Sequence, residues 1–64
     1  MFGVLHRYNA WEAGELLSDG TWHPFPGRYQ QRSGAVTNLR HNCRRLDVKP
    51  PWPVPTLTLP TKKA

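Results

Sequence analysis

The sequence predicts a small α+β or mainly irregular domain that continues into an extended proline-rich tail. Three observations predict this class. The chain has 64 residues, enough for one domain with a small core. Residues 33–49 have the apolar spacing of an amphipathic helix. Residues 50–64 contain five prolines, which favour extended backbone. We therefore expect one domain over residues 1–49 and a tail over residues 50–64.

The first expected element is a short strand over residues 2–8. When side chains alternate between two sides, one side of this segment carries Phe2, Val4, His6 and Tyr8. Alternation of this kind is typical of a strand with one buried side. His6 shares the apolar side, so we expect a packed or surface histidine and not a metal ligand.

The next segment, Asn9–Asp19, predicts a short acidic helix. Asn9 suits the cap position, and Glu12 follows three residues later, as in a capping box. Glu12 and Glu15 would also complement the positive end of the helix dipole. In this interpretation Trp11 fills the core, with a base-stacking role as the alternative.

Residues 21–32 predict a turn region centred on Pro26 and Gly27, since proline followed by glycine is a strong turn signal. Aromatic and basic residues interleave beyond it, at Arg28, Tyr29 and Arg32. Such a pattern can stack a base while the arginines pair with phosphates. The alternative is that Tyr29 buries its ring and the arginines remain in solvent.

A basic amphipathic helix over residues 33–49 is the element around which the chain is expected to be organised. Its apolar stripe is Val36, Leu39, Cys43 and Leu46. The opposite side carries a basic arc of Arg40, His41, Arg44 and Arg45. Ser33 or Thr37 is expected to cap its start, and Pro50 with Pro51 is expected to end it.

The tail is expected to pack and not to remain free. Its prolines alternate with the apolar residues Trp52, Val54, Leu57 and Leu59. A solvated tail has little use for such side chains. They suit either the chain's own helices or a groove on a partner. Lys62 and Lys63 are expected to be loose.

Charge is divided unevenly along the chain, whose net charge is +5. Residues 1–19 contain one arginine and three acidic residues, a net charge of −2, whereas residues 20–64 contain eight basic residues and one aspartate, a net charge of +7. A concentrated basic surface is the usual footprint of phosphate binding, with solubility alone as the alternative. No apolar run reaches the roughly 20 residues of a membrane span, and no secretory signal is expected.

No enzyme activity and no cofactor are expected. The acidic residues and histidines have no catalytic or metal-ligand spacing. The single cysteine, Cys43, excludes an internal disulfide and a multi-cysteine metal site. His41 and Cys43 diverge on a helix because they lie two residues apart. A lone cysteine fits the cytoplasm or another reducing compartment.

Two hypotheses of function follow. In the first, the chain is a small basic protein that binds nucleic acid or a nucleoprotein. The expected phosphate contacts are Arg28, Arg32, Arg40, His41, Arg44 and Arg45, with Trp22 and Tyr29 as stacking residues. In the second, the chain is an accessory subunit or inhibitor that docks on a larger protein assembly. Its anchor would be the tail residues Trp52, Val54, Leu57 and Leu59. A ribosomal or viral accessory protein would combine both.

Overall fold

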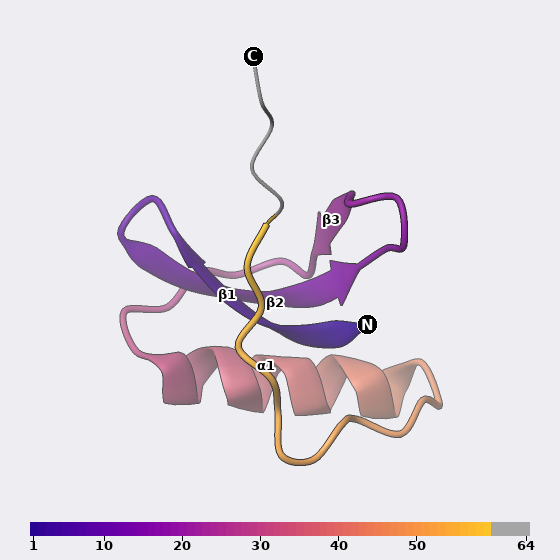
Figure 1. Cartoon of the computed structure of the whole chain (residues 1–64). Helices are drawn as coiled ribbons and strands as arrows, with labels where there is room; N and C mark the ends of the chain where they lie inside the picture. Colours follow the sequence, from indigo (N-terminus) through magenta and orange to yellow (C-terminus); the bar gives the residue numbers. More distant parts are fainter. Residues whose placement is uncertain (60–64) are drawn as a thin grey trace.

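A computed structural model describes residues 1–59 and arranges them as a mixed α+β fold of two layers. The strands are β1 (Phe2–Arg7), β2 (Ala10–Leu16) and β3 (Trp22–Pro24), and the helix is α1 (Arg32–Arg45). The strands form an antiparallel sheet in the order β1-β2-β3. The helix lies along one face of this sheet, and the segment after it turns back across α1 to reach β1 (Figure 1).

The short acidic helix expected at Asn9–Asp19 is wrong, because this segment contains strand β2. Tyr8 and Asn9 have φ values of 53° and 61° and join β1 to β2, whose nearest pair is Arg7 opposite Ala10. Two residues with positive φ are the favoured connection of a β-hairpin, and asparagine tolerates this conformation well. Asn9 is therefore a turn residue and not a helix cap.

Gly14 explains why β3 can approach β2 so closely. A Cβ atom at this position would meet the carbonyl oxygen of His23 and the Cα atom of Pro24. Glycine inside a strand often marks such a close approach of another backbone. In a helix Gly14 would only have been a cost.

The core lies between α1 and one face of the sheet. Its buried residues come from β1, β2, α1 and the tail, and they are Val4, Ala13, Ala35, Leu39, Cys43 and Val54. Val4 and Ala13 face each other across β1 and β2, so they share the face that α1 covers. Full burial of a side chain such as Leu39 contributes roughly 1.5–3 kcal/mol. In so small a core, each buried residue supplies a large share of the stability of the fold.

The basic helix is present, but its ends and its buried side differ from the expectation. It begins at Arg32, the cap residue is Gln31, and no side chain caps it, so Ser33 and Thr37 do not have that role. Leu39 and Cys43 are buried as expected, whereas Leu46 is 51% exposed. The difference arises because α1 ends at Arg45, before Leu46 can continue the stripe.

A left-handed residue, and not a proline, ends α1. Asp47 has φ 58°, and its N–H donates to the carbonyl of Arg44 at 3.1 Å. The N–H of Val48 donates to the carbonyl of Cys43 at 2.8 Å. These two bonds make a Schellman motif, which usually has glycine at the left-handed position. The chain therefore reverses three residues before Pro50.

Residues 54–57 of the tail belong to the fold. The N–H of Val4 donates to the carbonyl of Pro55 at 3.1 Å, and the N–H of Leu57 donates to the carbonyl of Val4 at 2.7 Å. This parallel pairing covers the outer edge of β1, and Val54 is buried in the core. A covered edge cannot pair with another chain. Pro60 and the lysines expected to be loose lie outside the described residues.

Residues 1–59 contain no helix with the length and apolar character that crossing a membrane requires.

Candidate nucleic-acid interface

The basic residues expected to contact phosphate separate into two groups in space. Arg28 and Arg32 are engaged in contacts within the fold. Arg40, His41, Arg44 and Arg45 are all exposed on α1, on the side away from the sheet. The second group forms no ion pair with a described residue.

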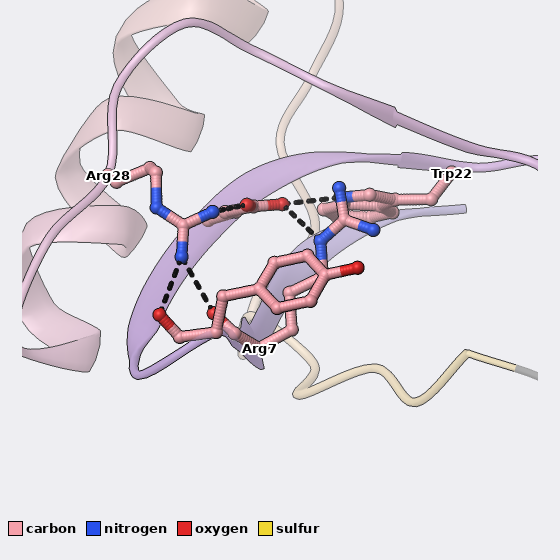
Figure 2. Close-up of polar contacts among 5 residues, drawn as sticks. Arg7, Trp22 and Arg28 are labelled. Atoms are coloured by element: carbon pink, nitrogen blue, oxygen red, sulfur yellow. Dashed lines mark hydrogen bonds and ion pairs between the residues drawn. The ribbon is translucent and has the colours of Figure 1, made fainter.

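Arg28 belongs to a cluster centred on the buried carboxylate of Glu12 (Figure 2). Its Nη1 donates to Glu12 Oε2, and its Nη2 donates to the carbonyls of Arg7 and Tyr8 at 2.9 Å each. Glu12 Oε1 accepts from Arg7 Nε at 3.0 Å and from Trp22 Nε1 at 2.9 Å. Arg28 therefore ties the first hairpin to the loop after β3.

The strand register explains why this cluster forms on the sheet face opposite α1. Glu12 lies opposite Leu5, next to the core pair Val4 and Ala13. Successive side chains of a strand point to opposite faces, so that of Glu12 points away from the helix. Trp22 lies opposite Leu16, which shares that face with Glu12. Trp22 is half-buried, and its indole N–H donates to Glu12 Oε1, so it helps to hold this cluster together.

Arg32 and Tyr29 are also used internally. Arg32 donates through Nη2 to the carbonyl of Val54 at 2.6 Å and through Nε to Thr56 Oγ1 at 2.8 Å. Tyr29 pairs with Trp11 through both backbone groups, and its ring packs against Gly34 of α1. We infer that these two residues hold the tail and the loop to the core.

The exposed side of α1 and the segment after it enclose an open groove of about 420 Å³. We call it the basic groove. It is lined by Arg40, Arg44, Asp47, Val48, Lys49 and Pro50. A smaller hollow of about 200 Å³ continues along the helix, lined by Thr37, Arg40, His41 and Arg44. Arg40 and Arg44 line both hollows because they lie one helical turn apart.

The arginines of this groove form no ion pair with a described residue. The ion pairs formed among residues 1–59 are Arg7–Glu12 and Arg28–Glu12, both on the other side of the sheet. Arg45, which lies on the same helix outside the groove, donates to the neutral Asn42 amide oxygen at 3.0 Å. Asp47 is the one carboxylate that lines the groove. The arrangement suits an anion, and one aromatic side chain of the protein lies beside it.

The aromatic side chain beside the groove is that of Trp52, which the sequence predicted as a docking residue of the tail. The indole is 79% exposed, and the guanidinium carbon of Arg40 lies 5.8 Å from its ring centroid. This is the range of a cation–π contact. Sequence reasoning missed the pairing because twelve positions separate the two residues and the chain reverses between them. Of the other tail residues, Val54 is buried, whereas Leu57 and Leu59 are half-buried.

Cys43 carries no chemistry in this arrangement. Its side chain has no exposed surface, and burial, followed by the charge of Glu15, raises the pKa of its thiol above the ordinary value. A raised pKa disfavours the reactive thiolate. Within residues 1–59, no group of three or more histidine, cysteine, aspartate or glutamate side chains lies close enough to hold a metal ion.

We expect the Cys43 thiol to react with a chromogenic disulfide reagent at least about 10-fold more slowly in the folded chain than in urea, because reaction requires local opening.

The pKa of the Cys43 thiol is higher in the folded chain than in the unfolded chain. The thiol therefore contributes stability below about pH 9, and this stability is lost as pH rises through the folded pKa. The urea midpoint of Cys43→Ala should therefore fall less steeply above pH 9. Equal slopes for the two proteins would contradict this.

Comparison of this chain with known proteins gave no match to a family model, to a curated protein or to a solved structure.

Proposed function

We propose that this protein binds nucleic acid through the exposed side of α1, with Arg40 and Arg44 contacting phosphates. The observation that carries the proposal is the state of these two arginines. They are exposed, lie one turn apart and form no ion pair with any described residue. Three other arginines, Arg7, Arg28 and Arg32, donate instead to groups within the fold.

The geometry of the two guanidiniums supports phosphate as the anion. They lie four residues apart, about 6 Å along the helix axis, so they can reach different phosphates of one strand. Arginine binds phosphate through two parallel hydrogen bonds, so a row of two arginines suits the regular row of phosphates along a strand. His41 and Lys49 add donors beside them, and Arg45 is exposed on the same helix.

The alternative function, docking on a protein assembly through the tail, has less support. Val54 is buried in the chain's own core, and residues 55–57 cover the edge of β1. A tail held in this way cannot serve as an extended anchor without leaving the fold. Of the other proposed anchor residues, Leu57 and Leu59 are half-buried, and the exposed Trp52 lies beside the basic groove.

The proposal is tested with the double variant Arg40→Gln and Arg44→Gln, which keeps much of each side chain and removes both charges. Binding to a fluorescent RNA hairpin with a large loop is followed by anisotropy at several salt concentrations. We expect an affinity loss of about 10- to 100-fold at low salt. The slope of log K against log salt should shrink by about 1.4–1.8, the contribution of two phosphate contacts.

The matched control is the double variant Asn9→Asp and Ser18→Glu, which lowers the net charge by the same amount at turns of the sheet. Asn9 is exposed and has a positive φ that aspartate tolerates, and Ser18 is exposed. The control should lose less than about threefold in affinity, because its changes lie off the groove. Equal losses for the two double variants, or no binding by the native chain, would refute the proposal.

A further inference from the structure

We propose that the basic groove selects single-stranded nucleic acid, with one unpaired base stacking on Trp52. This inference rests on the proposed function and names its ligand class. The observation behind it is an exposed indole held beside a phosphate-binding arginine. Trp52 is the most exposed of the large apolar side chains between residues 1 and 59.

Packing within the fold does not explain Trp52. The core residues of the tail begin at Val54, and the ring is 79% exposed. The ring makes a cation–π contact with the Arg40 guanidinium, which lies over one of its faces. Tyr8 is also exposed, but the arginines over its ring, Arg7 and Arg28, are ion-paired to Glu12, whereas Arg40 forms no ion pair with a described residue.

The position of Arg40 couples a stacking surface to a phosphate site. Its guanidinium is part of the basic groove and also lies 5.8 Å from the Trp52 centroid. A nucleotide whose phosphate contacts Arg40 would therefore have its base within reach of the indole. Proteins that hold single strands combine a positively charged groove with aromatic side chains in this way.

Apart from Lys49, which suits a phosphate, the remaining walls of the groove fit a base better. Val48 and Pro50 offer apolar surface, whereas the Asp47 carboxylate repels phosphate and accepts hydrogen bonds only. Amino groups on the edges of bases are suitable donors to such a carboxylate. In a duplex, the faces of the bases are hidden by stacking, so Trp52 has no use there.

The test compares a single-stranded RNA of about eight nucleotides with a blunt duplex of the same sequence. Anisotropy is measured for the native chain, Trp52→Phe, Trp52→Ala and the Arg40→Gln, Arg44→Gln double variant. We expect Trp52→Ala to lose roughly 5- to 100-fold on the single strand and less than about twofold on the duplex. Trp52→Phe should retain most of the affinity, because phenylalanine also stacks.

A second measurement in the same titration is tryptophan fluorescence. The single strand should quench the native chain, and this quenching should largely disappear in Trp52→Phe, which keeps Trp11 and Trp22. Thermal melting of each variant establishes that it is folded, which an exposed position favours.

Two failures can be told apart. If Trp52→Ala weakens both ligands equally, or neither, the stacking inference is overturned, while a loss in the arginine double variant still supports the proposed function. If the native chain binds neither oligonucleotide, both proposals fall.

Discussion

Replacing Glu12 with alanine should lower the free energy of unfolding by about 2–3 kcal/mol. The carboxylate is 4% exposed and accepts hydrogen bonds from Arg7, Arg28 and Trp22. Removing one member of a buried ion pair costs roughly 3–5 kcal/mol when the other charge is left in the interior. Here the arginine side chains remain 31% and 43% exposed, so water recovers part of that loss.

The measurement is thermal or urea unfolding followed by circular dichroism. For a domain of this size the expected loss corresponds to a fall of about 10–20 °C in Tm. Glu12→Gln should lie between the native chain and Glu12→Ala, because the amide oxygen can still accept from Trp22. The control is Glu15→Gln, a half-buried carboxylate with no ion pair among the described residues, which should change stability by about 0.5 kcal/mol or less. Equal shifts for the alanine variant and the control would contradict the structure.

Replacing Val54 with aspartate should unfold the protein at 25 °C. Val54 is 6% exposed and completes the core formed by β1, β2 and α1. A carboxylate without a partner at this position costs roughly 3–5 kcal/mol. The core of so small a domain supplies only about 3–5 kcal/mol in total, so little or no net stability should remain.

The matched control is Thr58→Asp, which changes the net charge equally at an exposed position of the same segment. It should leave the NMR peak dispersion and the Tm nearly unchanged. Deleting residues 50–64 should collapse the spectrum as Val54→Asp does. If the deletion keeps a dispersed spectrum, the domain ends at residue 49 and the packing of the tail is not needed for folding.

Sequence periodicity predicted the helix but not the residue at which it ends. Leu39, Cys43 and the exposed Arg40 and Arg44 follow from spacing, because a helix repeats every 3.6 residues whatever it packs against. Leu46 was misassigned because Asp47 ends α1 with a left-handed conformation. That conformation is common for glycine and uncommon for aspartate, so the sequence offers little signal for it.

The segment after β1 shows the limit of local propensity. Asn9, Glu12 and the following leucines satisfy the rules for a short helix, yet they form the turn and the second strand of a hairpin. Pairing with β1 decides the outcome, since strand formation depends on partners far more than helix formation does. A tyrosine in a turn with positive φ also hides the hairpin, because the usual signal there is glycine.

The sequence by itself determined that one basic amphipathic helix would present Arg40, His41, Arg44 and Arg45 to solvent. Only the tertiary structure decided which arginines are free. Arg28 and Arg32 are as basic as Arg40, but the fold brings Glu12 to the first and the Val54 carbonyl to the second. Such pairings join residues 16 and 22 positions apart, and no local rule reports them. The same long-range folding places Trp52 beside Arg40 and thereby forms the candidate site.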